Sequence, residues 1–356
     1  MASGSGYLRT SYQADLAIYD TAFRRFALGL LVVLLLLFPL VGSNYHIFLV
    51  NLVAIAIIGA LALNLLTGVA GQLSLGHAGF LAAGGFTTAI LVQQAHIPNF
   101  LLALLASGAA GAVLGVVVGL PSLRIKGVYL AIGTLAMHQL VVYGAGEYQH
   151  NYGYSTGVII PDPSIGPLVL NDDRDWFYFL LVVVGLAVVL CTNLMRTKPG
   201  RAWMALRDRE IAASILGVNL TYYKLLAFVV SSALAAIAGS LDAYYASFVS
   251  VEKYTFFLTI QYIAMIIIGG MGSILGSIYG AFFVVLLPYV INGAFAHLEV
   301  PQRLETYVFA VQYGAFGLFM GLFLILEPMG LVGIWLRLRS FFELWPFKFK
   351  QLARTS

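Results

Sequence analysis

The stretch "NLVAIAIIGALALNLLTGVAGQLSLGHAGFLAAGGFTTAIL", residues 51–91, contains no charged side chain. It lies within a longer segment, residues 26–123, that has no Asp, Glu, Lys or Arg. Because a membrane-spanning helix needs ~20 apolar residues, this segment alone can hold about four spans. The whole chain is 61% hydrophobic and 10% charged, whereas soluble globular domains carry about 25% charged residues. The sequence therefore predicts an all-α, polytopic membrane protein.

Apolar windows separated by polar, Pro or Gly residues indicate about ten spanning helices in total. These lie near residues 26–41, 46–66, 73–93, 100–120, 128–143, 176–195, 225–245, 256–270, 273–296 and 307–326. A polar segment without a small-residue cleavage site precedes the first span, so we expect that span to be retained. Cys191 is the single cysteine, and we expect it to pack in the core.

Basic residues are distributed unequally between the two sides of the predicted membrane topology. If the amino terminus is cytoplasmic, the 19 Lys and Arg residues are all cytoplasmic except Arg174, Lys253 and Arg303. This is the positive-inside pattern, which places both termini in the cytoplasm. The expected regions are a cytoplasmic or interfacial segment (1–25), a transmembrane domain (26–330) with an external loop (144–175) and a cytoplasmic loop (196–224), and an amphipathic cytoplasmic tail (331–356).

The cytoplasmic loop contains "KPGRAWMALRDREIAASILGVN", residues 198–219, which is unusually rich in charge for this chain. A helix is predicted over residues 201–216, with one apolar side and its charged residues elsewhere. The apolar side comprises Trp203, Leu206, Ile211, Ile215 and Leu216. Gly217 suits the end of this helix, and Asn219 or Thr221 is expected to cap the next one. Scattered basic residues would suffice to set orientation, so the amphipathic helix favours a docking function.

Two glycine-rich segments interrupt the apolar runs, one around residues 68–85 and one at residues 269–280. Irregular backbone at membrane depth is tolerated only where it is buried or lines a cavity. Paired interrupted segments indicate a central substrate site. The predicted substrate pathway comprises Asn64, Gln72, Ser74, Gly76, His77, Gly79, Thr134, His138 and Gln261. The alternative is structural: the glycines allow close helix packing, and the polar side chains bond neighbouring helices.

Missing motifs limit the functions that the chain can perform alone. No acid or base lies in the middle of a predicted span, where a proton- or sodium-driven carrier commonly has one. No phosphate-binding G-x-x-x-x-G-K-[ST] motif occurs, and "GGMGSILG", residues 269–276, lacks the lysine. No cluster of His, Asp, Glu or Ser suggests a membrane-embedded enzyme. We therefore expect no catalytic site, cofactor, metal or nucleic-acid partner on this chain, and a neutral or zwitterionic solute.

Several motifs resemble a known family. "EIAASILG", residues 210–217, resembles the E-A-A-x-x-x-G cytoplasmic loop of ABC importer permeases, although Ile211 replaces the first alanine of that motif. The resemblance is sharper to the branched-chain amino acid permeases and covers about residues 45–330. The segments that carry it are "GRA" (200–202), "KLLAF" (224–228), "LNLLTGVAGQLSLGHAGFLAAGGFTTAIL" (63–91), "GVYLAIGTLA" (127–136), "STG" (155–157) and "IGGMGSILGSIYGA" (268–281).

This resemblance implies a subunit that forms half of the translocation pathway of an importer in the bacterial inner membrane. The loop helix would contact an ATPase through Gly200, Arg201, Arg207, Asp208, Glu210, Ala212, Ala213 and Gly217. The implied partners are a second permease, two ATPase subunits that bind ATP and magnesium, and an external solute-binding protein facing residues 144–175 and 246–255. Branched-chain or hydrophobic amino acids are the implied substrates. Urea, small organic acids, and a stand-alone carrier or channel remain alternatives.

Overall fold

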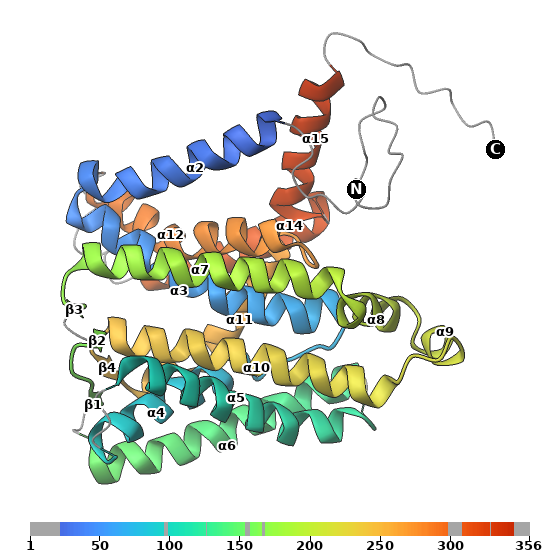
Figure 1. Cartoon of the computed structure of the whole chain (residues 1–356), viewed down its shortest axis with the longest axis horizontal. Helices are drawn as coiled ribbons and strands as arrows, with labels where there is room; N and C mark the ends of the chain where they lie inside the picture. Colours follow the sequence, from blue (N-terminus) through green and yellow to red (C-terminus); the bar gives the residue numbers. More distant parts are fainter. Residues whose placement is uncertain are drawn as a thin grey trace.

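The computed structural model describes residues 22–95, 99–125, 127–153, 157–165, 168–297, 308–327 and 329–344. Helices dominate these residues (Figure 1). Most of the predicted amino-terminal segment, the end of the tail, Arg303 and the first two residues of "STG" lie outside the described residues.

Each predicted span coincides with a helix. These helices are α2 (Ala22–Val41), α3 (Asn44–Leu63), α4 (His77–Gln93), α5 (Phe100–Ser122), α6 (Val128–Tyr152), α7 (Asp173–Arg196), α10 (Leu220–Tyr245), α11 (Phe256–Gly269), α12 (Ile274–His297) and α14 (Val308–Leu326). In the described part of the chain, six helices are long and apolar enough to cross a membrane. The α4 and α11 helices are shorter because irregular backbone interrupts them at the glycine-rich segments. The prediction of an all-α polytopic membrane protein is confirmed.

The remaining elements lie mostly at the two ends of the bundle (Figure 1). One end carries the short strands β1 (Val158–Ile159), β2 (Ser164–Ile165), β3 (Leu168–Val169) and β4 (Phe248–Val249), with the antiparallel pairs β1–β4 and β2–β3. The 3-10 helix η2 (Val251–Lys253) follows β4. The opposite end carries α8 (Lys198–Asp208) and α9 (Glu210–Ile215). A π-helix, η1 (Asn64–Val69), continues α3, and α15 (Gly330–Leu344) follows α14.

The α6 helix extends well beyond the end predicted at residue 143 and finishes at Tyr152. Its last turns are polar, so a hydropathy window assigns them to a loop. In the fold, the side-chain oxygen Oε1 of Gln149 accepts a hydrogen bond of 2.8 Å from the backbone N–H of Val251. This contact attaches the end of α6 to the segment after β4, and the external loop predicted over residues 144–175 begins correspondingly later.

The centre of the bundle is formed by α3 and α10, the most buried of the six long helices. The α10 helix packs most extensively on α5 and α4. The hydroxyl of Thr88 on α4 bonds Ser107 of α5 at 3.0 Å and Ser240 of α10 at 2.7 Å. A Cβ at Gly84 or Gly239 would collide with the backbone of the facing helix. Small residues therefore allow these helices to approach closely, as is typical of membrane bundles.

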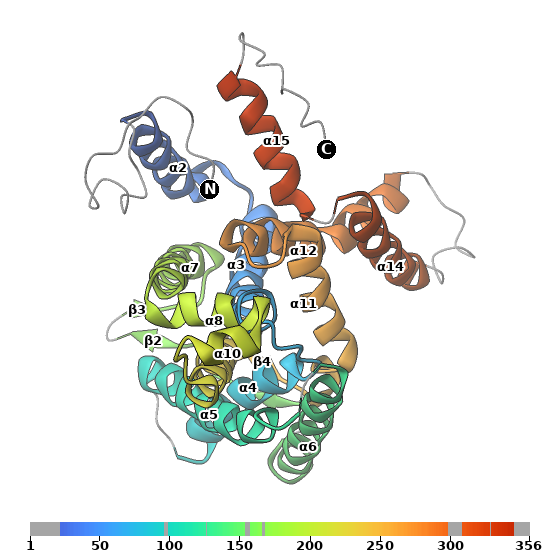
Figure 2. The ribbon, with the colours of Figure 1, turned by 90° about the vertical axis from the view of Figure 1, so that its right-hand side faces the viewer.

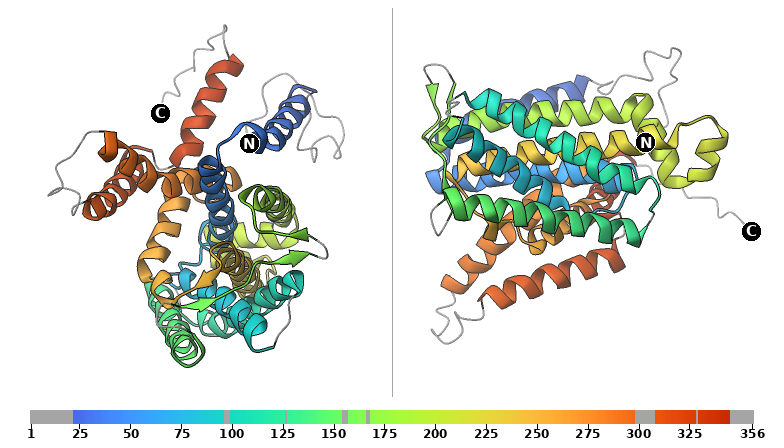
Figure 3. Two further views of the ribbon diagram at one scale, coloured as in Figure 1. Left: turned by 90° about the vertical axis from the view of Figure 1, so that its left-hand side faces the viewer. Right: turned by 90° about the horizontal axis from the view of Figure 1, so that it is seen from below.

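The α2 and α15 helices diverge from this bundle (Figure 2). The α15 helix runs across the direction of the long helices (Figure 1). Its start is set by Gly330, which has a φ of +63°, and Arg337 forms an ion pair of 2.9 Å with Glu327. The α14 helix forms the edge of the molecule seen from below (Figure 3) and packs on α11 and α12, where Phe319 and Phe323 contact Phe283. The amphipathic role predicted for residues 331–356 stays a prediction.

Replacing Gly239 with Ala should destabilise the bundle by about 1–3 kcal/mol, because the new methyl group would overlap the backbone of Leu81 on α4. The midpoint of thermal unfolding of the purified protein measures this effect. Gly133→Ala is the matched control, since nothing lies within 4 Å of a Cβ at that position. Equal midpoints for the two variants would contradict the close α4–α10 packing.

Candidate functional site

The chain leaves helical structure after η1 and re-enters it at His77, the first residue of α4. Within the intervening residues 70–76, the N–H groups of Ala70 and Gln72 still donate to the carbonyls of Leu65 and Leu66 in η1, at 3.0 Å each. The N–H of Leu75 donates to the Thr134 hydroxyl of α6 at 2.9 Å. At the start of α4, the N–H of Ala78 donates to the Thr259 hydroxyl of α11 at 3.0 Å. Side chains from two other helices therefore stabilise this interruption, as irregular backbone within a membrane requires.

Most residues of the predicted substrate pathway are buried around this interruption. Gln261 on α11 is half-buried, and the buried members are Asn64, Gln72, Ser74, Gly76, His77, Gly79, Thr134 and His138. The structure brings α4 and α6 together there, because Gly76 lies against Thr134 and Gly79 lies against His138. Contact of these residues with substrate stays a prediction.

Both histidines of this set form hydrogen bonds within the protein. Nε2 of His77 lies 3.0 Å from the carbonyl oxygen of Gly59, and Nε2 of His138 lies 2.9 Å from that of Tyr254. Among the described residues, Nδ1 of neither ring has a partner. These contacts agree with the structural interpretation of the two histidines in this conformation.

Asn64 joins the two glycine-rich segments. Its Oδ1 accepts a hydrogen bond of 2.8 Å from the N–H of Gly272, and its Nδ2 donates one of 2.8 Å to the carbonyl of Ser273. The residues between α11 and α12 are thereby attached to η1. Within the second segment, a Cβ at Gly280 would collide with the backbone of Met265, so close packing accounts for that glycine. Both segments and Asn64 itself were predicted from the sequence, but the hydrogen bonds of Asn64 that join the segments were not.

The charged loop differs from its prediction. A single helix over residues 201–216 was expected, but Arg209 is extended (φ −154°, ψ 97°) and separates α8 from α9. The α8 helix is attached to the bundle: Trp203 is fully buried, and its indole N–H donates to the carbonyl of Tyr223 at 2.8 Å. Gly200 lies against the backbone of Met195, where a Cβ would not fit. This break lets α8 pack on the bundle while α9 projects from it (Figure 1).

The predicted apolar side is consequently divided between the two helices. On α8, Trp203 and Leu206 are buried in the bundle. Around α9, the exposed fractions are 77% for Ile211, 81% for Ile215 and 82% for Leu216. The prediction that these five side chains share one face was wrong, because the extended backbone at Arg209 changes the helical register.

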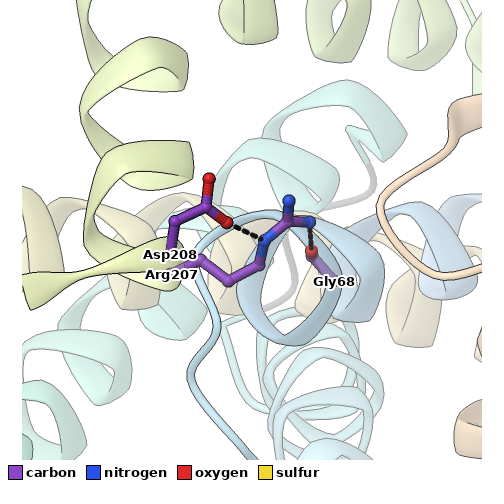
Figure 4. Close-up of polar contacts among 3 residues, drawn as sticks. All are labelled: Gly68, Arg207 and Asp208. Carbon is purple, nitrogen blue, oxygen red and sulfur yellow. Dashed lines mark hydrogen bonds and ion pairs between the residues drawn. The ribbon is translucent and has the colours of Figure 1, made fainter. Parts of the chain in front are cut away.

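The predicted ATPase-contact residues also separate into two groups. Arg201, Arg207, Asp208, Ala212 and Gly217 are exposed, Glu210 is half-buried, and Gly200 and Ala213 are buried. The Arg207 side chain points back toward the bundle, where its Nη1 donates to the carbonyl oxygen of Gly68 at 2.8 Å (Figure 4). Its Nε lies 3.3 Å from Oδ1 of Asp208 (Figure 4). Arg207 therefore contacts a transmembrane segment.

The position of α9 depends on contacts at both of its ends. Glu210 in its first turn forms an ion pair with Lys224 of α10, whose side chain is 10% exposed. Gly217, with a φ of +84°, follows the helix in the left-handed conformation that favours glycine. Asn219 then caps α10 by accepting a hydrogen bond of 3.0 Å from the N–H of Tyr222. The predicted terminator is confirmed, and Asn219 rather than Thr221 is the cap.

The broken spans and the protruding charged loop lie within a region of the chain that matches a known protein family. The family model described as the permease component of the branched-chain amino acid transport system matches residues 45–326. The chain belongs to this permease family. No solved structure matches the chain.

Individual relatives of this permease carry related descriptions. The chain is 34% identical over 291 residues to the high-affinity branched-chain amino acid transport system permease protein LivM of Salmonella typhimurium, covering 75% of this chain and 68% of the relative. A probable LivM of Methanocaldococcus jannaschii is 26% identical over 244 residues, 65% of this chain and 68% of the relative. The autoinducer 2 import system permease protein LsrC of an Enterobacter species is 28% identical over 204 residues, 55% of this chain and 56% of the relative.

The strand end of the permease contains a polar cluster after β4. The hydroxyl of Ser250 hydrogen-bonds the carboxylate of Glu252, which lowers the pKa of that carboxyl, and Gln149 contributes a weaker contact at 3.5 Å. Nearby, Lys253 forms an ion pair of 2.6 Å with Asp242 at the end of α10. These contacts hold the 246–255 segment against α6 and α10.

Replacing Lys224 with Met should loosen α9, because it removes the ion pair that joins Glu210 to α10. Trypsin should then cleave after Arg209 about tenfold faster than in the unmodified permease. Mass spectrometry of timed digests measures the rate of this cut. Lys198→Met is the control, since Lys198 is exposed at the start of α8. Identical rates for both variants would show that the ion pair does not hold α9.

Proposed function

We propose that this permease forms half of the transmembrane pathway of an ATP-driven importer and that α9 is its docking element for an ATPase subunit. The observation that carries this proposal is the exposed apolar cluster of Ile211, Ile215 and Leu216. This cluster projects beyond the ends of the long helices (Figure 1), where the bilayer does not cover it. Exposed apolar patches with a polar rim mark protein interaction sites, and α9 lies in the E-A-A-like motif.

The attachment of α8 suits it to transmit force from such a partner. Its buried face, including Trp203 and Leu206, packs on the bundle, and Lys224 attaches α9 to α10. A displacement of α9 by an ATPase would therefore move α8 and α10 with it. Rigid movement of packed helices is an established way to convert a local event into a change of access.

The charges at the two ends of the bundle support the proposed orientation, and membership of the permease family supports the proposed partners. The α8–α9 end is cytoplasmic, as are both termini, and its basic residues include Arg196, Lys198 and Arg201. The strand end, with Asp172, Asp173 and Glu252 among others, faces outward and receives the solute-binding protein. A second permease completes the pathway in the inner membrane. ATP and magnesium bind the two ATPase subunits, and this chain itself has no catalytic role and carries no cofactor.

Branched-chain amino acids are the proposed substrates. The family match and the 34% identity to LivM of Salmonella typhimurium support this choice over urea or organic acids. The physical character of the interrupted region is also suitable, since the predicted pathway side chains are polar but uncharged. Such a lining can bond the charged ends of a zwitterion through dipoles and helix ends. Co-expression of the permease with its genomic neighbours, followed by ATP-dependent leucine uptake into proteoliposomes, tests this proposal directly.

Replacing Ile215 with Asp should reduce co-purification of the ATPase subunits about tenfold, because a charge would enter the centre of the apolar contact. Folding should be retained, since Ile215 is 81% exposed. Ile159→Asp is the matched control: Ile159 is also exposed but lies on β1 at the opposite end. Normal ATPase recovery with Ile215→Asp would exclude α9 as the docking element.

A cysteine at Ser74 should become reactive toward a small water-soluble thiol reagent during transport, in a chain that lacks Cys191. Ser74 is only 2% exposed in this conformation, so the proposal requires its labelling to rise when ATP and loaded binding protein are added. Ser231→Cys is the control, because the Ser231 hydroxyl is buried and bonds the carbonyl of Ala62 in the core. Protection of position 74 in every state would leave only a packing role for residues 70–76.

A further inference from the structure

The Arg207 side chain packs against Gly71 and Gly272 and bonds the carbonyl of a third glycine, Gly68. A Cβ at Gly71 would lie 2.8 Å from Cγ and 3.0 Å from Cβ of Arg207, and one at Gly272 would lie 3.0 Å from Nη1. A Cβ at Gly68 would collide with Asn64. Gly71 and Gly272 also have left-handed φ values of +69° and +78°. The stem of Arg207 therefore lies close against Gly71 and its guanidinium close against Gly272, where neither glycine-rich segment presents a side chain.

The carbonyl that Arg207 contacts needs a partner from elsewhere. Gly68 lies in the last turn of the continuous helix formed by α3 and η1, where carbonyl groups lack helical partners and carry the negative end of the helix dipole. The last turns of α3 and η1 contain no basic residue. Arg207 supplies a charge-assisted hydrogen bond at this position. Its contact with Asp208, which is 69% exposed, is an exposed ion pair that contributes little.

The same turn is attached to the second glycine-rich segment. Asn64 of η1 bonds Gly272 and Ser273, which lie between α11 and α12. The end of α8, the end of α3 and the α11–α12 connection thus meet at one joint, defined here by Asn64, Gly68, Arg207 and Gly272. In this arrangement a movement of α8 would displace the adjoining ends of α3, α11 and α12, because side-chain hydrogen bonds connect them.

We propose that Arg207 is a positioning residue that carries the movement of α8 to the ends of α3, α11 and α12, and so couples ATP hydrolysis to opening of the pathway. The inference rests on the proposed function and adds a specific link to it. Arg207 acts through Gly68 and Asn64, and it need not touch either substrate or ATPase. Loss of this contact should lower solute uptake per ATP hydrolysed, while the permease and the ATPase subunits remain bound to each other.

The test uses Arg207→Gln in the complete complex with its ATPase subunits and binding protein, reconstituted in proteoliposomes. ATPase co-purification, ATP hydrolysis with and without loaded binding protein, and leucine uptake are measured together. We expect wild-type co-purification and an uptake per ATP hydrolysed that falls about tenfold, the factor supplied by one charge-assisted hydrogen bond. Lys198→Gln removes an equal charge from an exposed position of α8 and should leave all three quantities unchanged.

Other outcomes separate the competing explanations. A lower melting temperature with unchanged uptake per ATP would make Arg207 only a structural cap and overturn the inference. Loss of ATPase co-purification in Arg207→Gln would make it a docking residue and also overturn the inference, while the proposed function would stand. Failure of the unmodified permease to recover any ATPase would instead overturn the proposed function. If Arg207→Gln aggregates, Arg207→Lys replaces it, because lysine keeps the charge and a hydrogen-bond donor. The quantity measured is again the uptake per ATP hydrolysed.

Discussion

The backbone that leaves helical structure between Val69 and His77 must be hydrogen-bonded inside the protein, because a bilayer offers it no water. Side chains from elements distant in the sequence supply hydrogen bonds near this interruption. Thr134 brings α6 to Leu75, Thr259 brings α11 to the start of α4, and Arg207 brings α8 to Gly68. The interruption of one transmembrane segment thereby organises the helices around it.

The cytoplasmic loop of the proposed orientation combines attachment with exposure. Trp203 and Leu206 hold α8 on the bundle, whereas Ile211, Ile215 and Leu216 remain exposed around α9. The extended conformation of Arg209 makes this division possible, and the ion pair between Glu210 and Lys224 joins α9 to α10. A loop built this way can present an apolar surface to another protein and still transmit displacement into the membrane domain.

Some features could be predicted from sequence and others could not. Hydropathy and helix propensity are local, so the positions of the spans and the end of the loop at Gly217 and Asn219 were predicted well. The break at Arg209 was missed because the pattern of residues 201–216 is compatible with one continuous amphipathic helix. Asn64 was selected as a polar residue at membrane depth, but its bonds to Gly272 and Ser273 join segments more than two hundred positions apart along the chain.

The sequence by itself determined that this chain is a helical membrane protein of the branched-chain amino acid permease family, because composition and short motifs depend on neighbouring residues. Tertiary structure alone decided where the polar groups are directed. Arg207 could have been an exposed member of the charged loop, yet it bonds a carbonyl 139 positions away. That contact exists because packing brings α8 to the end of α3, and because Gly71 and Gly272 leave room for the stem and the guanidinium of Arg207.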